Sequence, residues 1–220
     1  MALAAFVQAR MSSRRFPGKV LAPFRGEPLI RHVLSSIAQA APSCSIVVAT
    51  SDHPSDDPLA AYVSTLRVPV FRGALDDVFR RFRDCLEAFP CDWILRISGD
   101  SPLLDPRVVR AVVNHAARPA QNVDVVTTVF PRTFPSGQNA ELIRGEALRS
   151  IDAGTLTDED REHVTTYFYR NAGRFRIVNV ASGVPQLAAL RLAIDSVEDL
   201  ERLEKSADIE VQALAAAFQH

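Results

Sequence analysis

The sequence of 220 residues is short of glycine, cysteine and long apolar runs, and each shortage excludes a class of protein. Only 9 glycines occur. They form neither a G-x-G-x-x-G fingerprint nor a Walker A loop, which excludes the usual glycine-rich nucleotide loops. The 3 cysteines, Cys44, Cys85 and Cys91, match no disulfide framework or zinc spacing, so we expect a reduced, cytoplasmic setting. No segment reaches the ~18 apolar residues of a membrane-spanning helix, and the apolar run at 3–7 is too short for a secretory signal.

Neither sign of charge dominates, since 25 Lys and Arg stand against 26 Asp and Glu, a net charge of −1. This balance argues against broad electrostatic binding of nucleic acid, which requires a strongly basic domain. With 47% hydrophobic and 23% charged residues, the composition is that of a globular chain that buries its core without disulfides or structural metals. We expect a single domain spanning residues 1–220.

Apolar runs alternate with helical patterns through residues 1–128. Strands are predicted at 3–7, 45–50, 68–71, 93–97 and 123–128, and helices at 28–40, 57–66, 76–89 and 105–117. Strands separated by helices of this length indicate βαβ units, and hence an α/β fold with a mainly parallel sheet flanked by helices. We interpret residues 1–128 as the nucleotide-binding half.

The pattern changes in residues 129–220. Pro131, Pro135 and Gly137 interrupt a stretch that we expect to be loop and edge strand. Beyond it, the sequence predicts helices at 145–153, at 160–171 and from residue 197 onward, and strands at 175–180 and 190–194.

The loop after the first predicted strand is strongly basic. Its cations all precede the first acid of the chain, Glu27; they are Arg10, Arg14, Arg15 and Lys19. Ligands of open α/β sheets collect beyond the carboxyl ends of the strands, which is where this loop lies. With two serine hydroxyls at positions 12 and 13, the loop suits phosphate oxygens; a solvated basic loop is the alternative.

Two acidic residues follow predicted strands at the same sheet edge. Asp100 comes after the strand at 93–97, and Asp195 after the strand at 190–194. Mg²⁺ prefers one or two protein carboxylates together with phosphate oxygens, so both are candidate ligands. The alternative role is capping the next helix, for which Asp105 competes with Asp100, and Ser196 with Asp195.

Five segments in order along nearly the whole chain carry a family resemblance. They are FVQARMSSRRFPGKVL (6–21), RISGDSPLLDP (96–106), RTFPSG (132–137), DREHVT (160–165) and RLAIDSVEDL (191–200). Together they resemble the cytidylyltransferases that activate acidic sugars as CMP-sugars, most closely the branch of spore-coat polysaccharide biosynthesis proteins of the SpsF type. The first segment is the most specific.

The resemblance implies a nucleotide-diphospho-sugar transferase fold, which is Rossmann-like. It also implies transfer of CMP from CTP to a sugar, with release of pyrophosphate, for surface polysaccharide biosynthesis. Mg²⁺ is the implied cofactor. The implied assembly is a homodimer whose contact is made by the inserted region around 130–141, and residues 129–220 are expected to bind the acceptor.

The same resemblance assigns roles to individual residues. Catalysis is expected of Arg10, Lys19 and Asp100, and metal binding of Asp100 and Asp195. The residues expected to bind the nucleotide are Gln8, Ala9, Arg10, Ser12, Ser13, Lys19, Arg96 and Ser98. Those expected to bind the acceptor are Asp77, Glu141, Arg161 and His163.

One segment departs from that branch. Residues 136–141 read SGQNAE where the branch usually has DGLDVE, so Ser136 and Asn139 replace two expected carboxylates. The sugar acceptor is therefore left open, as is the choice between CTP and another nucleotide. Two further functions also stay open: a glycosyltransferase of the same fold with a nucleotide-sugar donor, and a non-catalytic nucleotide-binding subunit.

Overall fold

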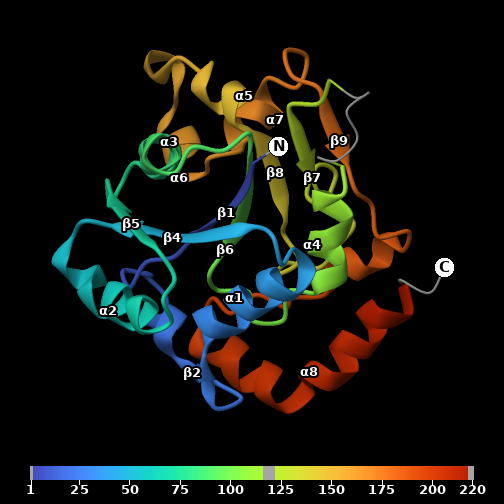
Figure 1. Ribbon diagram of the computed structural model, residues 1–220. Helices are drawn as coiled ribbons and strands as arrows, with labels where there is room; N and C mark the ends of the chain where they lie inside the picture. Colours follow the sequence, from blue (N-terminus) through green and yellow to red (C-terminus); the bar gives the residue numbers. More distant parts are fainter. Residues whose placement is uncertain (1, 116–121, 218–220) are drawn as a thin grey trace.

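A seven-stranded sheet in the order β5-β4-β1-β6-β8-β7-β9 forms the centre of the computed structural model, which describes residues 2–115 and 122–217 (Figure 1). The strands are β1 (Leu3–Gln8), β4 (Ser45–Ser51), β5 (Val70–Gly73), β6 (Trp93–Ser98), β7 (Val125–Thr127), β8 (Glu141–Arg144) and β9 (Ile177–Asn179). All run in one direction except β8, which is antiparallel to both of its neighbours. The predicted mainly parallel sheet is confirmed.

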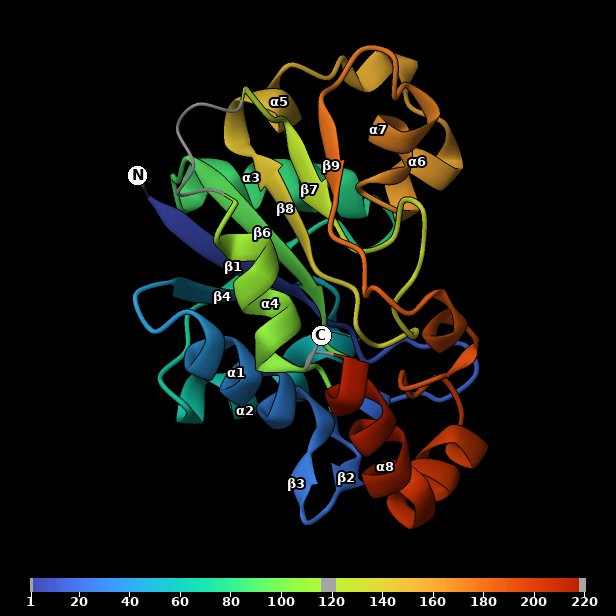
Figure 2. The same ribbon diagram turned by 90° about the vertical axis from the view of Figure 1, so that its right-hand side faces the viewer.

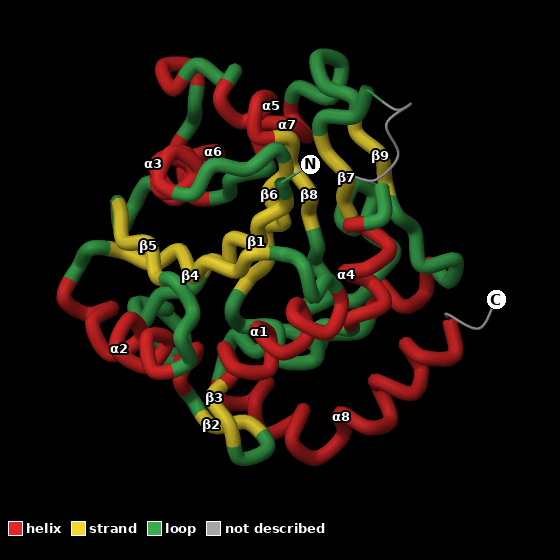
Figure 3. Tube along the Cα trace, viewed as in Figure 1, coloured by secondary structure: helices red, strands yellow, loops and turns green. Residues whose placement is uncertain are grey.

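Helices cover both faces of the sheet (Figures 1 and 2). One face carries α1 (Leu29–Ala40), α2 (Asp57–Thr65), α4 (Pro106–Val113) and α8 (Val197–Ala217). The other carries α3 (Val78–Ala88), α5 (Gly145–Arg149), α6 (Asp158–Glu162) and α7 (Thr166–Arg170). A small hairpin of β2 (Pro23–Phe24) and β3 (Glu27–Pro28) leads into α1 (Figure 3), and short 3₁₀ turns lie at Lys19–Leu21, Pro54–Asp56, Ala153–Thr155 and Pro185–Ala189.

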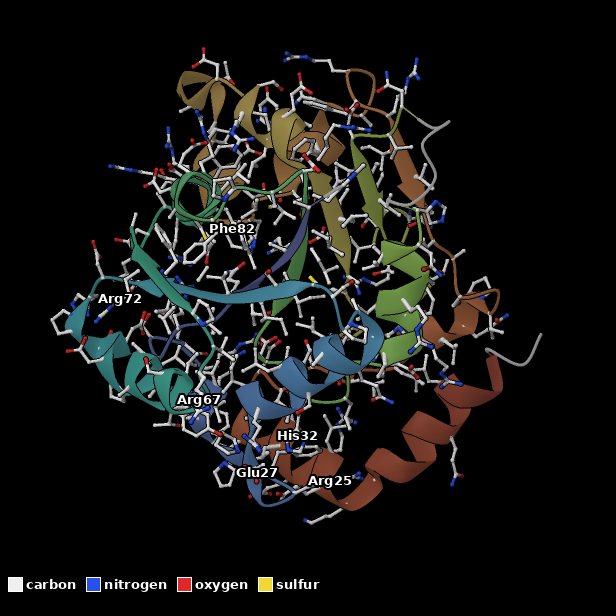
Figure 4. The ribbon with its side chains drawn as sticks, viewed as in Figure 1. Arg25, Glu27, His32, Arg67, Arg72 and Phe82 are labelled. Carbon is white, nitrogen blue, oxygen red and sulfur yellow. The ribbon has the colours of Figure 1, made fainter. Side chains whose placement is uncertain are left out.

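The side chains of β1 alternate between two separate cores. Ala5 and Val7 belong to the core beneath α1, α2 and α4, whereas Phe6 belongs to the core beneath α3. Phe6 meets Phe82 of α3 edge to face, with ring centroids 6.0 Å apart. Phe82 is labelled in Figure 4. A strand covered on both faces has to be apolar throughout, which explains the uninterrupted apolar run. Each fully buried Phe contributes about 1.5–3 kcal/mol of transfer free energy.

The second half differs from the sequence prediction in three places. β8, where no strand was predicted, lies inside the sheet and pairs with both β6 and β7, while the stretch with Pro131 and Pro135 that was expected to be loop and edge strand is a loop with two isolated bridges. The predicted helix at 160–171 is two helices, since His163 adopts extended backbone between them. Residues 190–194 form a single bridge, from Arg191 to Ser136, rather than a strand. The last residues of the helix predicted at 105–117 lie outside the described residues.

Gly137 brings the segment before α8 against the loop that follows β7. Its φ is +89°, and a Cβ at this position would lie 2.5 Å from the carbonyl carbon of Leu192. Only glycine tolerates that backbone conformation at such close approach. The approach holds residues 190–195 beside the end of β6, where the backbone N–H of Ile194 donates to the carbonyl of Asp100 over 3.0 Å.

Helix capping leaves the two candidate metal ligands uncommitted. Asp105 caps α4 by accepting from the backbone N–H of Arg107 over 2.7 Å. At the start of α8, the hydroxyl of Ser196 accepts from the backbone N–H of Asp199 over 3.3 Å. The competing residues thus take the capping roles, and the carboxylates of Asp100 and Asp195 are available for other contacts.

Candidate active site

A cavity of about 350 Å³ opens at the carboxyl ends of β1 and β6. Of the residues predicted for nucleotide binding, metal binding and catalysis, all but Ser12 line it, and His163 of the acceptor set joins them. The full lining is Gln8, Ala9, Arg10, Ser13, Arg14, Arg15, Lys19, Val20, Arg96, Ser98, Asp100, Glu162, His163 and Asp195. Residues up to 187 positions apart therefore meet in one place, from Gln8 to Asp195.

A second cavity, of about 530 Å³, adjoins the first and shares Arg10, Arg14 and Glu162 with it. Ser12 lies here, together with Asp77 and Arg161, two of the residues predicted to bind the acceptor; the rest of the lining is Leu75, Asp76 and Asp158. Asp77 caps α3, and its carboxylate also pairs with Arg161 Nη1 over 2.8 Å. The predicted acceptor set is thus divided between the two cavities, and Glu141 lines neither of them.

Lys19 links the two predicted metal ligands. Its Nζ donates to Asp100 Oδ2 over 2.7 Å, to Asp195 Oδ1 over 2.8 Å and to the carbonyl of Ile194 over 3.0 Å. Burial by itself lowers the pKa of Lys19, but Asp100 and Asp195 outweigh burial and raise that pKa above its ordinary value. The lysine is therefore fully charged at neutral pH.

Asp195 is surrounded by cations. Besides Lys19, the guanidinium of Arg15 approaches its Oδ2 to 3.0 Å. Burial alone raises the pKa of Asp195, but Lys19 and Arg15 outweigh that effect and lower the pKa below its ordinary value. The carboxylate is ionised at neutral pH and available to a cation.

The chemistry of this donor set fits a hard divalent cation. Two carboxylate oxygens converge on a single positive charge, the Lys19 ammonium, which stands in the region where a metal ion would sit. Within residues 2–115 and 122–217, no cluster of three or more His, Cys, Asp and Glu side chains is suited to metal binding. A metal held by Asp100 and Asp195 thus needs further oxygen ligands, and phosphate and water supply them in typical magnesium sites.

A second cation and carboxylate pair has its cation in the cavity wall, since Arg96 lines the cavity and its partner Glu141 does not. Arg96 Nη2 donates to Gln8 Oε1 over 3.0 Å, and its Nη1 pairs with the buried carboxylate of Glu141. The Tyr169 hydroxyl donates to the same carboxylate and lies 2.8 Å from the Thr127 hydroxyl. Burial, reinforced by Glu141, raises the pKa of Tyr169. An acceptor role for Glu141 stays a prediction, while Tyr169 was missed because its helical pattern looks like ordinary core.

Asp56 anchors the cationic loop to the sheet and was also missed by the sequence. Its buried carboxylate accepts from the backbone N–H of Met11 over 2.7 Å, from Thr50 Oγ1 over 2.9 Å and from the backbone N–H and hydroxyl of Ser51. Burial alone raises the pKa of Asp56, but these hydrogen bonds outweigh burial and lower it. The helix start predicted at residue 57 is confirmed, because Asp57 is the first residue of α2.

The two residues that replace family carboxylates lie away from both cavities. The Asn139 side chain accepts from Arg132 Nη1 over 2.7 Å, and Ser136 forms the backbone bridge to Arg191. Neither residue lines either of these two cavities, and neither contacts Lys19, Asp100 or Asp195 through its side chain in the described residues.

The sheet order, with one reversed strand and a cationic cavity at the carboxyl edge, is that of the nucleotidyltransferase fold. A solved cytidylyltransferase from Leptospira borgpetersenii has the same fold, with a TM-score of 0.90 and 27% identity, covering 100% of this chain and 94% of that one. A CMP-2-keto-3-deoxy-manno-octonic acid synthetase solved with CTP shares the fold at a TM-score of 0.71 and 19% identity, covering 96% of this chain and 100% of that one.

The chain belongs to the cytidylyltransferase family, whose model matches residues 4–216. The spore coat polysaccharide biosynthesis protein SpsF of Bacillus subtilis is 31% identical over 90% of this chain and 83% of its own. A 3-deoxy-manno-octulosonate cytidylyltransferase of Paramagnetospirillum magneticum is 30% identical over 90% of this chain and 82% of its own. The family resemblance, the fold and the enzyme class expected from the sequence are confirmed. Among the described residues, every helix is too short or too polar to cross a bilayer.

Proposed function

We propose that this cytidylyltransferase transfers CMP from CTP to a hydroxyl group of a sugar and releases pyrophosphate, in the synthesis of a surface polysaccharide precursor. One observation carries the proposal: Lys19, Asp100 and Asp195 converge in a cavity whose other cations are Arg96 and three arginines of a single loop. Such a cavity matches the charge of a nucleoside triphosphate. The full-length similarity to SpsF and to a 3-deoxy-manno-octulosonate cytidylyltransferase supports the reaction type.

The reaction forms a bond between the sugar oxygen and the α-phosphorus of CTP and breaks the bond from that phosphorus to pyrophosphate. Such a transfer requires positioning and charge stabilisation more than covalent catalysis. Arg10, Arg14 and Arg15 face the cavity and would bind phosphate oxygens, balancing the charge that builds on the leaving pyrophosphate. Asp100 and Asp195 would hold a divalent cation, Mg²⁺ in this proposal, whose charge stabilises the reacting phosphoryl oxygens.

We further propose an acidic or polysaccharide-precursor sugar as the acceptor. His163 lines the cavity that contains Asp100, and Asp77 and Arg161 line the adjoining one, so side chains of both halves are available to orient a sugar. We also propose a cytoplasmic homodimer that pairs through residues 130–141. The dimer and its contact region rest on the family resemblance.

A thermal-shift panel tests the proposal. CTP, UTP, GTP, ATP, CMP-sugars and UDP-sugars are each added with and without Mg²⁺, and products are sought by mass spectrometry with candidate sugars. A ligand at about 100 times its Kd stabilises the folded state by roughly 2.7 kcal/mol, which is readily detected. We expect CTP with Mg²⁺ to give the largest shift. Stabilisation by nucleotide-sugars alone would instead favour a glycosyltransferase, and no response to any nucleotide would contradict both enzymes.

A further inference from the structure

Lysine is rare in this chain, and one of its two copies lies at the centre of the site. Of the 25 basic residues, Lys19 and Lys205 are lysines and the other 23 are arginines. Lys205 is exposed on α8. An ammonium is a compact point charge on a flexible stem, whereas a guanidinium is a wide planar fork. The ammonium resembles a metal ion more closely than the guanidinium does, because it is small and oxygen acceptors can surround it.

Lys19 occupies the point where the two carboxylates converge, with all three of its N–H donors engaged. They are directed to Asp100 Oδ2, Asp195 Oδ1 and the carbonyl of Ile194, at 2.7, 2.8 and 3.0 Å. A metal ion bridging Asp100 and Asp195 needs carboxylate oxygens at about 2.0–2.1 Å, and the ammonium already holds one oxygen of each carboxylate. The ammonium and a dication also repel each other. The two cations therefore compete for the carboxylates.

The surroundings of Lys19 show which groups could attract its ammonium away from Asp100 and Asp195. The side chains of Asp100 and Asp195 are 21% and 30% exposed on the cavity side, so the cluster is open toward the place where phosphates would bind. A triphosphate in that cavity offers the ammonium new anionic acceptors. The four-carbon stem of lysine lets Nζ move without a change in the backbone. Arg15 remains on Asp195 from the solvent side and keeps part of its charge balanced.

We propose that Lys19 holds Asp100 and Asp195 together as a stand-in cation until the triphosphate draws it away, so that a divalent metal ion binds with or after CTP and not before. This inference rests on the proposed function, because it assumes that the cavity receives CTP. It gives Lys19 a role besides balancing charge during the reaction: Lys19 sets the order in which metal and nucleotide bind. Binding in this order keeps metal from occupying the carboxylates in the absence of substrate.

Binding of Mn²⁺, followed by the electron paramagnetic resonance signal of the free ion, tests the competition. The wild type is titrated with and without the α,β-methylene analogue of CTP, and Mn²⁺ bound by the analogue alone is subtracted. We expect weak binding without the analogue and at least about tenfold tighter binding with it. The Lys19→Met variant should bind Mn²⁺ without nucleotide at least about tenfold more tightly than the wild type. The matched control, Lys205→Met, should behave as the wild type.

A wild type that binds Mn²⁺ equally well with and without the analogue would overturn the proposal. So would a folded Lys19→Met variant, checked by circular dichroism, that binds no more tightly than the wild type. If CTP stabilises the protein in the thermal-shift panel and the competition is absent, the binding order fails while the proposed function stands. If no nucleotide stabilises the protein, the proposed function itself fails.

A second measurement uses only the wild-type chain and so does not depend on the folding of a variant. With ¹³C-labelled lysine, NMR of the side-chain Cε groups gives one signal for Lys19 and one for Lys205, an internal reference. The CTP analogue should shift the Lys19 signal, Mg²⁺ alone should leave it in place, and the Lys205 signal should stay constant in both. A Lys19 signal that moves with Mg²⁺ alone would contradict the proposed order.

Discussion

Two clusters of cation and carboxylate lie at the carboxyl edge of the sheet. They differ in the shape of the cation and in how far the carboxylates are exposed. Lys19 joins two carboxylates that open onto the cavity, and its ammonium is carried on a flexible four-carbon stem. Arg96 is fixed as a fork between Gln8 and Glu141, whose side chain is only 2% exposed. The first arrangement suits exchange of one cation for another, and the second suits a fixed geometry.

The carboxylates of the two clusters differ in burial, and this difference explains why a single chain uses both arrangements. Removing one partner from a buried ion pair leaves an uncompensated charge, which costs about 3–5 kcal/mol. In the Lys19 cluster the ammonium is also buried, at 10% exposure, but the two carboxylates are 21% and 30% exposed and can be hydrated when the lysine is removed. The Arg96 pair is therefore expected to act mainly on stability and geometry, and the Lys19 cluster mainly on turnover. Variants of the two clusters test this division.

The largest expected effect follows from the Lys19 cluster. Lys19→Ala and Asp100→Asn should each lower turnover by about 10²- to 10³-fold, because each removes a charge contact worth several kcal/mol in the transition state. The unfolding transition should be retained in both. Pyrophosphate release measures turnover, and Lys205→Ala, which removes an exposed lysine, is the control. Near wild-type rates for both variants would rule out this assignment of the site.

The second effect concerns the buried pair. Glu141→Gln keeps the shape of the side chain but removes the charge that faces Arg96, and it should lower the free energy of unfolding by about 2–3 kcal/mol. Urea unfolding at pH 7 measures the loss. The control is Glu27→Gln, which breaks an exposed pair with Arg31 at 3.3 Å and should cost under about 0.5 kcal/mol. Equal losses in the two variants would remove the distinction drawn between buried and exposed pairs.

The third effect concerns Asp56, a buried carboxylate whose contribution to stability depends on pH. Its pKa in the folded protein is lowered, so its contribution to stability is fully present above the unfolded pKa of about 3.9 and is lost as pH falls through the folded pKa. Asp56→Asn should cost about 1.5–2 kcal/mol at pH 7, from weakened hydrogen bonds to Met11, Thr50 and Ser51. The gap between the wild type and this variant, measured by urea unfolding, should narrow below pH 4. A gap that stays constant down to pH 2 would contradict the lowered pKa.

The sequence predicted the first half of the fold well because its signals are local. Apolar runs and helix starts such as Asp105 depend on neighbouring residues, and the structure confirms them. The position of β8 was missed, because pairing on both sides is a long-range property of the sheet. Motif resemblance indicated Lys19 and Asp195, but no local pattern shows that an ammonium bridges carboxylates from two distant loops.

The smallest effect is expected from Tyr169, which donates to Glu141 in the Arg96 cluster. Tyr169→Phe removes the hydroxyl that donates to Glu141 and keeps the ring stacked on Phe130, whose centroid lies 4.8 Å away. A lost hydrogen bond of this kind costs about 1 kcal/mol of stability. The matched control is Tyr167→Phe in the same helix, whose hydroxyl accepts from Arg174 over 3.1 Å, away from Glu141. Because Glu141 still holds Arg96, turnover should fall only a few-fold in Tyr169→Phe and stay unchanged in Tyr167→Phe. Equal turnover in the two variants would show that the Tyr169 hydroxyl supports the fold and leaves the position of Arg96 unaffected.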